Sequence, residues 1–333
     1  MTPRLICLDL RGGTVLPFEA PLPPTVLCLG NFDGVHLAHA ALVREGRRLT
    51  ALIRAQRNDP RILCGVFCFL RPSGDYFLQS GTHPTHLTTL KERIVALQGL
   101  GVDVIWLCDF PTVRDLLPSA FLNLLQAECA CVGAVCGYNH RFGRKAAGDP
   151  SLLAATLGEA CVSVLPPLSI DGIPVSSTRI RACLSKGDVE TAERLLGRPY
   201  SLEGRVLHGK SLGHTWGFPT ANQIFPADRL IPAHGVYAVT CYTPSGTFPG
   251  VANIGLRPTV ESPQRVNCET HIIGFSGDLY GKMLKVEFCK FLRPEQRFDS
   301  VEELTAAIRR DTHTAAVYGA RRQAQKNKRS ESS

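Results

Sequence analysis

Two histidines in a glycine-containing segment near the N-terminus have the residue types that bind a polyphosphate. The segment reads Leu29-Gly-Asn-Phe-Asp-Gly-Val-His-Leu-Ala-His39 and stands between a short apolar run and a helical pattern. It is therefore expected at the carboxyl end of a strand and at a helix N-terminus, where α/β sheets bind phosphates. The imidazoles of His36 and His39 can hydrogen-bond charge that develops on a pyrophosphate. A zinc pair is the competing interpretation, but no Cys or carboxylate stands at a companion spacing.

A second segment, Val175-Ser-Ser-Thr-Arg-Ile-Arg181, also opens a helical pattern. It offers hydroxyls, backbone N–H groups and a guanidinium to the same triphosphate. An ordinary helix cap is the simpler interpretation of its two serines taken alone. The candidate phosphate-binding residues of the two segments are Gly30, Asn31, Asp33, Gly34, Ser176, Ser177, Thr178 and Arg181.

In the second half of the chain, Gly217-Phe-Pro-Thr-Ala-Asn222 follows a glycine-rich approach, Gly209–Gly213. Glycine permits close backbone approach to a phosphate, and Thr and Asn supply neutral oxygens for Mg²⁺ and hydrogen bonds. A turn leading into a strand is the alternative for this segment alone. The candidate ATP- and phosphate-binding residues here are Gly217, Pro219, Thr220 and Asn222, and Thr220 and Asn222 are the candidate Mg²⁺ ligands.

A carboxylate stands inside an otherwise apolar run, Val266-Asn-Cys-Glu-Thr-His-Ile-Ile273. Alternation along a strand puts Asn267, Glu269 and His271 on one face. Burying a carboxylate is costly unless it has a partner or a task. Glu269 is therefore a candidate catalytic base, with a solvated residue on an open sheet face as the alternative.

The elements that position the first two segments alternate between strand and helix. The predicted buried strands are residues 25–30, 62–70, 102–107, 131–136 and 161–165, and the predicted helices are residues 40–56, 88–100 and 118–128. Such alternation implies right-handed crossovers and a parallel sheet. The first part of the chain is therefore predicted to be a doubly wound, Rossmann-like α/β domain.

From about residue 200 the pattern becomes β-rich, with turns that contain Gly and Pro. Predicted strands cover residues 235–243, 247–254, 265–273 and 283–292, and a helix is predicted near residues 300–310. A mainly antiparallel barrel with one terminal helix fits this pattern. The predicted domains are residues 1–186 and 187–320, with a disordered basic tail at residues 321–333.

Composition narrows the function classes. Of 333 residues, 44% are hydrophobic and 20% charged, which is ordinary for a soluble globular protein, and no run is long enough to span a bilayer. The 13 cysteines lack paired metal-site spacing and lie in apolar runs, so buried thiols are expected. Half of the net charge of +8 lies in residues 321–333, and no basic–aromatic platform indicates nucleic-acid binding. The prediction is a cytoplasmic protein that binds neither nucleic acid nor membrane.

The second half resembles the riboflavin kinase family. The resemblance rests on Gly217–Asn222, Gly250-Val-Ala-Asn-Ile-Gly-Leu-Arg-Pro-Thr259, the Glu269-Thr-His271 strand, Asp278-Leu-Tyr-Gly281 and Leu292–Phe298. It implies a six-stranded barrel that phosphorylates the riboflavin 5′-hydroxyl with ATP. Thr220 and Asn222 would hold Mg²⁺ and the ATP phosphates, and Glu269 would accept the hydroxyl proton. Arg293 is a candidate contact to the flavin.

The first half is similar to the nucleotidyltransferase domain of prokaryotic FAD synthetases. The similarity rests on Leu29–His39, Val175–Arg181, Leu87-Thr-Thr-Leu-Lys-Glu-Arg93 and Gly137-Tyr-Asn-His-Arg-Phe-Gly143. It implies transfer of AMP from ATP to FMN, with catalytic roles for His36 and His39. The order of the two halves matches the bifunctional riboflavin kinase/FAD synthetase family, whose substrates are riboflavin, FMN and ATP.

Apart from His214, where many relatives of the kinase half carry Arg, the departures from the family pattern lie in the first half. Ala38 replaces a glycine of H-x-G-H, Asn139 and His140 replace Asp and Phe of G-x-D-F-R-F-G, and Phe69–Ser73 replaces F-x-P-H-P. Asn139 stays a candidate flavin contact. The departures keep open a second interpretation, a riboflavin kinase with an impaired or inactive transferase domain. A remote third is a non-enzymatic flavin- or RNA-binding protein.

Overall fold

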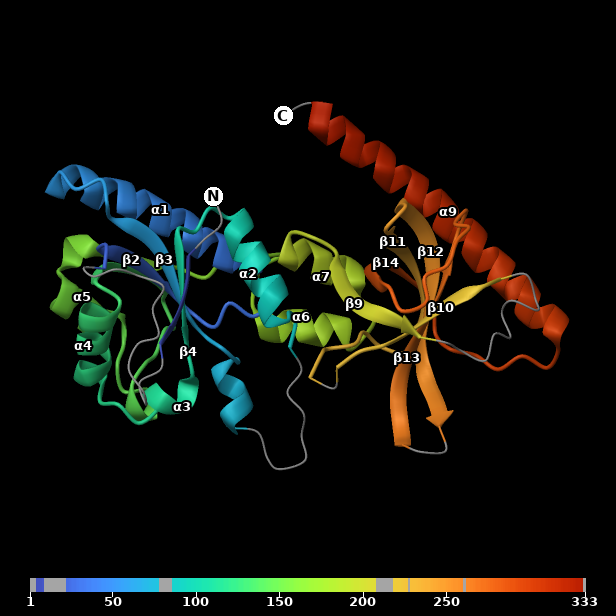
Figure 1. Ribbon diagram of the computed structural model, residues 1–333, viewed down its shortest axis with the longest axis horizontal. Coiled ribbons are helices and arrows are strands. Elements are labelled where there is room, and N and C mark those ends of the chain that lie inside the picture. The colour runs from blue at the N-terminus through green and yellow to red at the C-terminus, as the bar shows by residue number, and fades with distance from the viewer. Residues whose placement is uncertain are drawn as a thin grey trace. The chain divides into compact units, whose positions relative to one another are not determined.

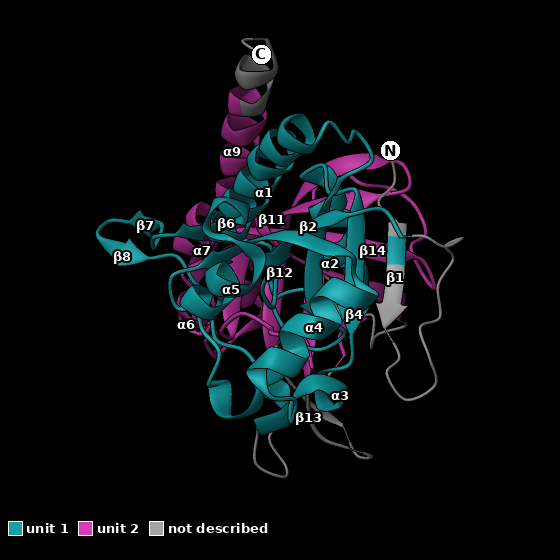
Figure 2. Ribbon diagram, turned by 90° about the vertical axis from the view of Figure 1, so that its left-hand side faces the viewer, with its two compact units in different colours: residues 1–177 teal, residues 178–333 magenta. Residues whose placement is uncertain are grey.

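The chain divides into two compact units, Met1–Ser177 and Thr178–Ser333 (Figure 2). The structure is a computed structural model, and it describes residues 4–8, 22–77, 86–207, 218–226, 228–259 and 262–331. Of the predicted site residues, Gly217 lies outside this range.

The first unit contains a six-stranded sheet in which every neighbouring pair of strands is parallel (Figure 1). Its strands are β1 (Arg4–Leu8), β2 (Thr25–Leu29), β3 (Leu63–Phe69), β4 (Val104–Cys108), β5 (Cys131–Gly137) and β6 (Val162–Leu165), in the order β1-β4-β3-β2-β5-β6. All five predicted strands are confirmed, and β1 is an addition that the sequence did not indicate. A separate hairpin pairs β7 (Ser169–Ile170) with β8 (Ile173–Pro174).

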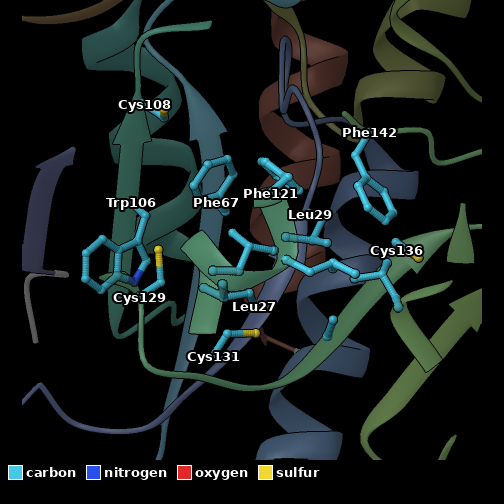
Figure 3. Packing of buried hydrophobic residues seen from close by; sticks show 14 of the residues in the cluster. Leu27, Leu29, Phe67, Trp106, Cys108, Phe121, Cys129, Cys131, Cys136 and Phe142 are labelled. Carbon is cyan, nitrogen blue, oxygen red and sulfur yellow. The ribbon is translucent and has the colours of Figure 1, made fainter. Parts of the chain in front are cut away.

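Helices connect these strands and cover both faces of the sheet. They are α1 (Leu37–Arg57), α2 (Leu90–Gly99), α3 (Phe110–Val113), α4 (Pro118–Glu128) and α5 (Pro150–Leu157), with short 3₁₀ turns at Ser73–Phe77, Arg144–Ala146 and Glu159–Cys161. Strand β2 is fully buried, and its side chains alternate between two apolar clusters. Leu27 and Leu29 pack with Trp106 in one cluster (Figure 3), and Val26 and Cys28 belong to the other. Burial of both faces confirms the doubly wound α/β prediction.

The strand order locates the expected ligand edge. From β2 the chain passes to β3 and β4 on one side, and later to β5 and β6 on the other. The order therefore reverses beside β2, and ligands of such sheets bind outside the carboxyl ends of the strands at this switch point. The loop after Leu29 occupies that position.

The second unit is built around a closed barrel of antiparallel strands, which confirms the predicted six-stranded barrel. The strands are β9 (Tyr200–Leu207), β10 (Thr220–Ile224), β11 (Gly235–Thr243), β12 (Gly246–Thr259), β13 (Ser262–Ile272) and β14 (Met283–Arg293), closed in the order β10-β13-β12-β11-β14-β9. Helix α6 (Ser177–Leu184) begins at the last residue of the first unit and leads to α7 (Val189–Leu196). Ala315 of the terminal helix α9 (Val301–Glu331) packs with Val236 and Val251 on the barrel.

Helix α9 differs from the expectation at its end. The sequence analysis ended the domain at residue 320 and expected a disordered tail, but the helix continues to Glu331. The residues of this segment are mostly Ala, Arg, Gln and Lys, which favour helix. Arg322 adds a tertiary anchor, because its guanidinium donates two hydrogen bonds of 2.7 Å to the Glu193 carboxylate.

The cysteines behave as the sequence predicted. The twelve whose side chains the structure describes are free thiols, and most are buried. Within the described residues, no cluster of His, Cys, Asp and Glu side chains could hold a metal ion. None of the described helices is both long enough and apolar enough to cross a membrane.

Candidate functional site

The loop after β2 follows a strained backbone path before it enters α1. Phe32 and Val35 have φ angles of 52° and 41°, in the left-handed region that residues with a side chain rarely adopt. Such strain persists only where the surroundings enforce it, and it clusters at functional sites. His36 then caps α1, since its Nδ1 accepts from the His39 N–H at 3.4 Å. The two imidazoles are stacked, with ring centroids 3.7 Å apart.

Asp33 holds this loop to the start of α2. Its carboxylate is 2% exposed and accepts from the Leu87 and Thr88 N–H groups at 3.1–3.2 Å. The Thr88 hydroxyl also accepts from the Gly34 N–H at 3.0 Å. These contacts fix the shape of the phosphate-binding candidate loop, so Asp33 has a structural task in addition to the ligand contact predicted for it.

Ser177 joins the second predicted segment to this loop. Its hydroxyl donates to the Asp33 carbonyl at 2.9 Å, across 144 positions of sequence. The structure thus brings Ser177 together with the Gly30–His36 loop, and the triphosphate site predicted from the two segments stays a prediction. Thr178 and Arg181 follow in α6, within the second unit.

An aromatic cavity of about 580 Å³ adjoins the same loop, and the sequence analysis did not predict it. Gly30 and Asn31 line it from the loop. Its apolar walls include Phe67, Phe69, Phe77, Phe110, Phe121 and Phe142, and its basic lining residues are Arg114, Arg141, Arg144 and Lys145. Flat apolar walls and several cations suit an aromatic ligand that carries a negative charge. No single motif predicts it, because its phenylalanines come from elements far apart in the sequence.

The two motif departures at residues 139 and 140 have different surroundings. Asn139 is exposed and is not among the residues that line the cavity. His140 does line it, and its Nε2 is buried without a hydrogen-bond partner among the described residues. Burial, reinforced by the adjacent Arg141, lowers the pKa of His140 to about 4. The imidazole is therefore neutral at pH 7.

The kinase candidates lie side by side across three barrel strands. Glu269 of β13 is directly opposite Asn222 of β10 on one side and Asn253 of β12 on the other. Residues opposite one another in a sheet share a face. Val251, two residues before Asn253, packs against Ala315 of α9, so this is the outer face of the barrel.

Asn267 connects two of these side chains. Its Nδ2 donates to Glu269 Oε1 at 3.0 Å and to Asn222 Oδ1 at 3.2 Å. Asn222 and Asn267 are 8% and 6% exposed, so these hydrogen bonds are largely shielded from water. Sequence reasoning placed Asn267 and Glu269 on one face but gave Asn267 no task.

The Thr220 hydroxyl is available to bind a metal ion or a phosphate. His271 Nδ1 lies 3.0 Å from the Pro219 carbonyl, which fixes the residue before Thr220. Among the described residues, the Thr220 hydroxyl has no hydrogen-bond partner, and Asn222 Oδ1 accepts one bond and retains a second lone pair. These neutral oxygens match the donor set that Mg²⁺ prefers.

Arg293, the candidate flavin contact, is held by the terminal helix. Its Nε and Nη2 lie 3.0 and 2.9 Å from an Asp311 oxygen, and its guanidinium lies 5.5 Å from the centroid of the Phe298 ring. The structure therefore shows Arg293 in a salt bridge with α9, and its contact with flavin stays a prediction.

Two family models together match most of the chain. One described as FAD synthetase matches residues 19–179, and one described as riboflavin kinase matches residues 196–318. A solved structure described as a macrolide-efflux protein from Streptococcus pneumoniae is 26% identical, with a TM-score of 0.79 over 92% of this chain and 97% of that one.

Curated relatives carry both halves in the same order. The bifunctional riboflavin kinase/FMN adenylyltransferase of Haemophilus influenzae is 35% identical over 88% of this chain and 93% of its own length. Those of Pseudomonas fluorescens and Escherichia coli are 36% and 35% identical over 89% and 90% of this chain, and over 93% and 94% of their own lengths. Both family models and the relatives at 35–36% identity cover the two halves of this chain in the same order. The chain therefore belongs to the family of bifunctional riboflavin kinases/FMN adenylyltransferases.

Proposed function

We propose that the chain makes FAD from riboflavin in two ATP-dependent steps. The second unit phosphorylates riboflavin to FMN, and the first transfers AMP from ATP to FMN and releases pyrophosphate. The observation that carries the proposal is Glu269 in register between Asn222 and Asn253, on a barrel joined to a nucleotidyltransferase-like sheet.

In the kinase step, Glu269 accepts the proton of the riboflavin 5′-hydroxyl as that oxygen attacks the γ-phosphorus of ATP, and ADP leaves. Asn267 orients the carboxylate through its Nδ2. Thr220 and Asn222 would hold Mg²⁺, which would neutralise charge on the ATP phosphates. A positioned base of this kind contributes about 10²–10⁴-fold to the rate.

In the transferase step, a phosphate oxygen of FMN attacks the α-phosphorus of ATP, and the bond to pyrophosphate breaks. His36, His39 and the Gly30–Gly34 backbone bind the phosphates at the start of α1, together with Ser176 and Ser177 of the same unit. The aromatic cavity takes the isoalloxazine ring of FMN, because it opens beside Gly30 and Asn31. We assign residues 1–186 to this step and residues 187–320 to the kinase.

The test is one time course. Purified protein with riboflavin, ATP and Mg²⁺ is sampled, and riboflavin, FMN and FAD are separated by chromatography. FMN followed by FAD is the expected result. FMN alone would support the second interpretation, a kinase with an inactive transferase, and would direct attention to Ala38, Asn139 and His140. Neither product from folded protein would reject both steps.

We further propose that the protein acts in the cytoplasm on free substrates, without nucleic acid or membrane. The support for a cytoplasmic location is that both steps consume ATP. Cell fractionation that recovers the protein with membranes or RNA would contradict it.

A further inference from the structure

Arg93 is a buried cation that the two reactions above do not use. It lies in the first turns of α2 and is 3% exposed. Its Nη1 donates to the Asn31 carbonyl at 3.2 Å and its Nη2 to the Leu70 carbonyl at 2.8 Å. These carbonyls stand just beyond the carboxyl ends of β2 and β3. One side chain therefore ties together the two strand ends at the switch point of the sheet.

The charge on Arg93 has no carboxylate to neutralise it among the described residues. Both of its hydrogen-bonded partners are neutral carbonyls, and Nε is buried without an acceptor there. An unpaired buried charge is costly. The positive end of the α2 dipole adds to that cost. Holding two backbone carbonyls requires only hydrogen-bond donors, which a neutral side chain could supply. The positive charge of Arg93 therefore needs a separate explanation.

The loops that Arg93 holds are those that form the ligand site. Asn31 lines the aromatic cavity and continues into the strained turn that leads to His36. Ser73, three residues after Leu70, lines the same cavity, and its N–H and hydroxyl donate to Asn31 Oδ1 at 3.4 and 3.2 Å. Asn31 is thus held through its carbonyl by Arg93 and through its side chain by Ser73.

We propose that Arg93 is a positioning residue for adenylyl transfer, which fixes the Asn31 and Leu70 loops and lends its unneutralised charge to the polyphosphate of ATP. The proposal rests on the transferase step proposed above. A buried charge is screened by salt far less than a surface charge, so it acts on an anion without touching it.

Three variants separate the role of the Arg93 charge from the role of its hydrogen bonds to the Asn31 and Leu70 carbonyls. Arg93→Gln keeps donors and removes the charge, whereas Arg93→Lys keeps the charge and loses one of the two carbonyl contacts. Arg54→Gln is the matched control, because Arg54 lies in the same unit, donates to the Ile62 carbonyl at 2.7 Å and makes a long ion pair of 3.7 Å with Asp103. In each full-length variant we would measure FAD formation from supplied FMN, inhibition by inorganic pyrophosphate, thermal unfolding and the riboflavin kinase rate.

Arg93→Gln is expected to lower kcat/KM for ATP in FAD formation on the order of 10²-fold, as displaced reacting groups do. It should also weaken inhibition by pyrophosphate, while the kinase rate stays within about twofold of wild type. Arg93→Lys should retain pyrophosphate inhibition and lose chiefly kcat. Arg54→Gln should change none of these.

Equal weakening of pyrophosphate inhibition in Arg93→Lys and Arg93→Gln would overturn the role of the charge, and unchanged FAD formation in both would overturn the whole proposal. If Arg93→Gln fails to fold, the lysine variant decides, because its pyrophosphate inhibition either persists or is lost. A wild-type protein that makes no FAD would instead reject the transferase step. Direct binding of inorganic pyrophosphate to wild type and to the two Arg93 variants would then still test the charge.

Discussion

The two units build their sites in different ways. The first places its candidate groups on a loop whose path depends on Phe32 and Val35 at positive φ, and on contacts from Asp33, Arg93 and Ser177. The second places its groups on strands, where the sheet register alone sets Glu269 opposite its two asparagines. A strand position is fixed by the hydrogen bonds of its ladder, whereas a loop position is fixed by a small number of side chains.

Most of the departures from the family pattern lie in the first unit, and His214 in the second half lies outside the described residues. Ala38, Asn139, His140 and the Phe69–Ser73 segment all belong to the loop-based unit. Asn139 and His140 follow β5 in a loop, and loops accept changed residues more readily than the elements that they connect. On a strand, a changed residue keeps its position, so its chemistry must be retained.

The largest expected effect tests the strand-based site. Glu269→Gln keeps the shape of the side chain but removes the base, so FMN formation should fall by about 10²–10⁴-fold. FAD formation from supplied FMN should be unaffected, which gives an internal control in the same sample. Turnover equal to wild type would remove Glu269 from the mechanism.

A second variant tests the loop-based site. His39→Ala removes one of the two stacked imidazoles while His36, the cap of α1, remains in place. FAD formation should fall by about 10²-fold, in the range of one lost transition-state donor. The riboflavin kinase rate serves as the reference, and retention of full transferase activity would argue that the imidazole of His39 contacts no reacting group.

Acid should destabilise the first unit through His140. Its pKa is about 4 in the folded protein, against about 6.5 when unfolded. The unfolded chain thus binds the extra proton between these values, and stability falls as the pH drops from 6.5 towards 4. At pH 5 the loss is about 2 kcal/mol relative to neutral pH.

Thermal unfolding of wild type and His140→Phe at pH 7 and pH 5 checks this linkage. Between pH 7 and pH 5, the first unit of the phenylalanine variant should lose less stability than that of wild type. An equal loss in both proteins would show that His140 is not the group responsible.

The smallest effect concerns the orientation of Glu269. Asn267→Ala removes the donor to Glu269 Oε1 and Asn222 Oδ1. Loss of a hydrogen bond to a charged group costs about 1.5–3 kcal/mol, so the kinase kcat should fall by about 10-fold to 10²-fold. Asn267→Gln offers partial rescue. A change in the KM for riboflavin without a change in kcat would point to substrate contact instead of orientation.

Sequence patterns predicted the elements well where the pattern is local. Apolar runs identified β2 to β6, and β-rich runs separated by turns that contain Gly and Pro identified β11 to β14. The site roles of His36, Ser177 and Glu269 came from the family resemblance and stay predictions, and the hydrogen bond from Ser177 to the Asp33 carbonyl brings two of the predicted segments into contact.

Features that depend on distant partners were missed. The aromatic cavity draws Phe67, Phe110 and Phe142 from separate segments, and the two carbonyl partners of Arg93, at Asn31 and Leu70, lie 62 and 23 positions away. The helical end of α9 was likewise missed, since its anchor Glu193 lies 129 positions from Arg322. Periodicity carries no information about such pairings.

Strand β1 has a consequence for how the protein behaves when it is overproduced or trimmed. It pairs with β4 along the whole of Arg4–Leu8 and so covers the outer edge of a strand that reads Val-Ile-Trp-Leu-Cys. An uncovered apolar edge recruits strands from other molecules. The FAD synthetase match begins only at residue 19, so a shortened protein designed from that match would expose β4 and be prone to aggregate. Keeping these five residues should therefore favour soluble expression, although they lie outside the region matched by the FAD synthetase model.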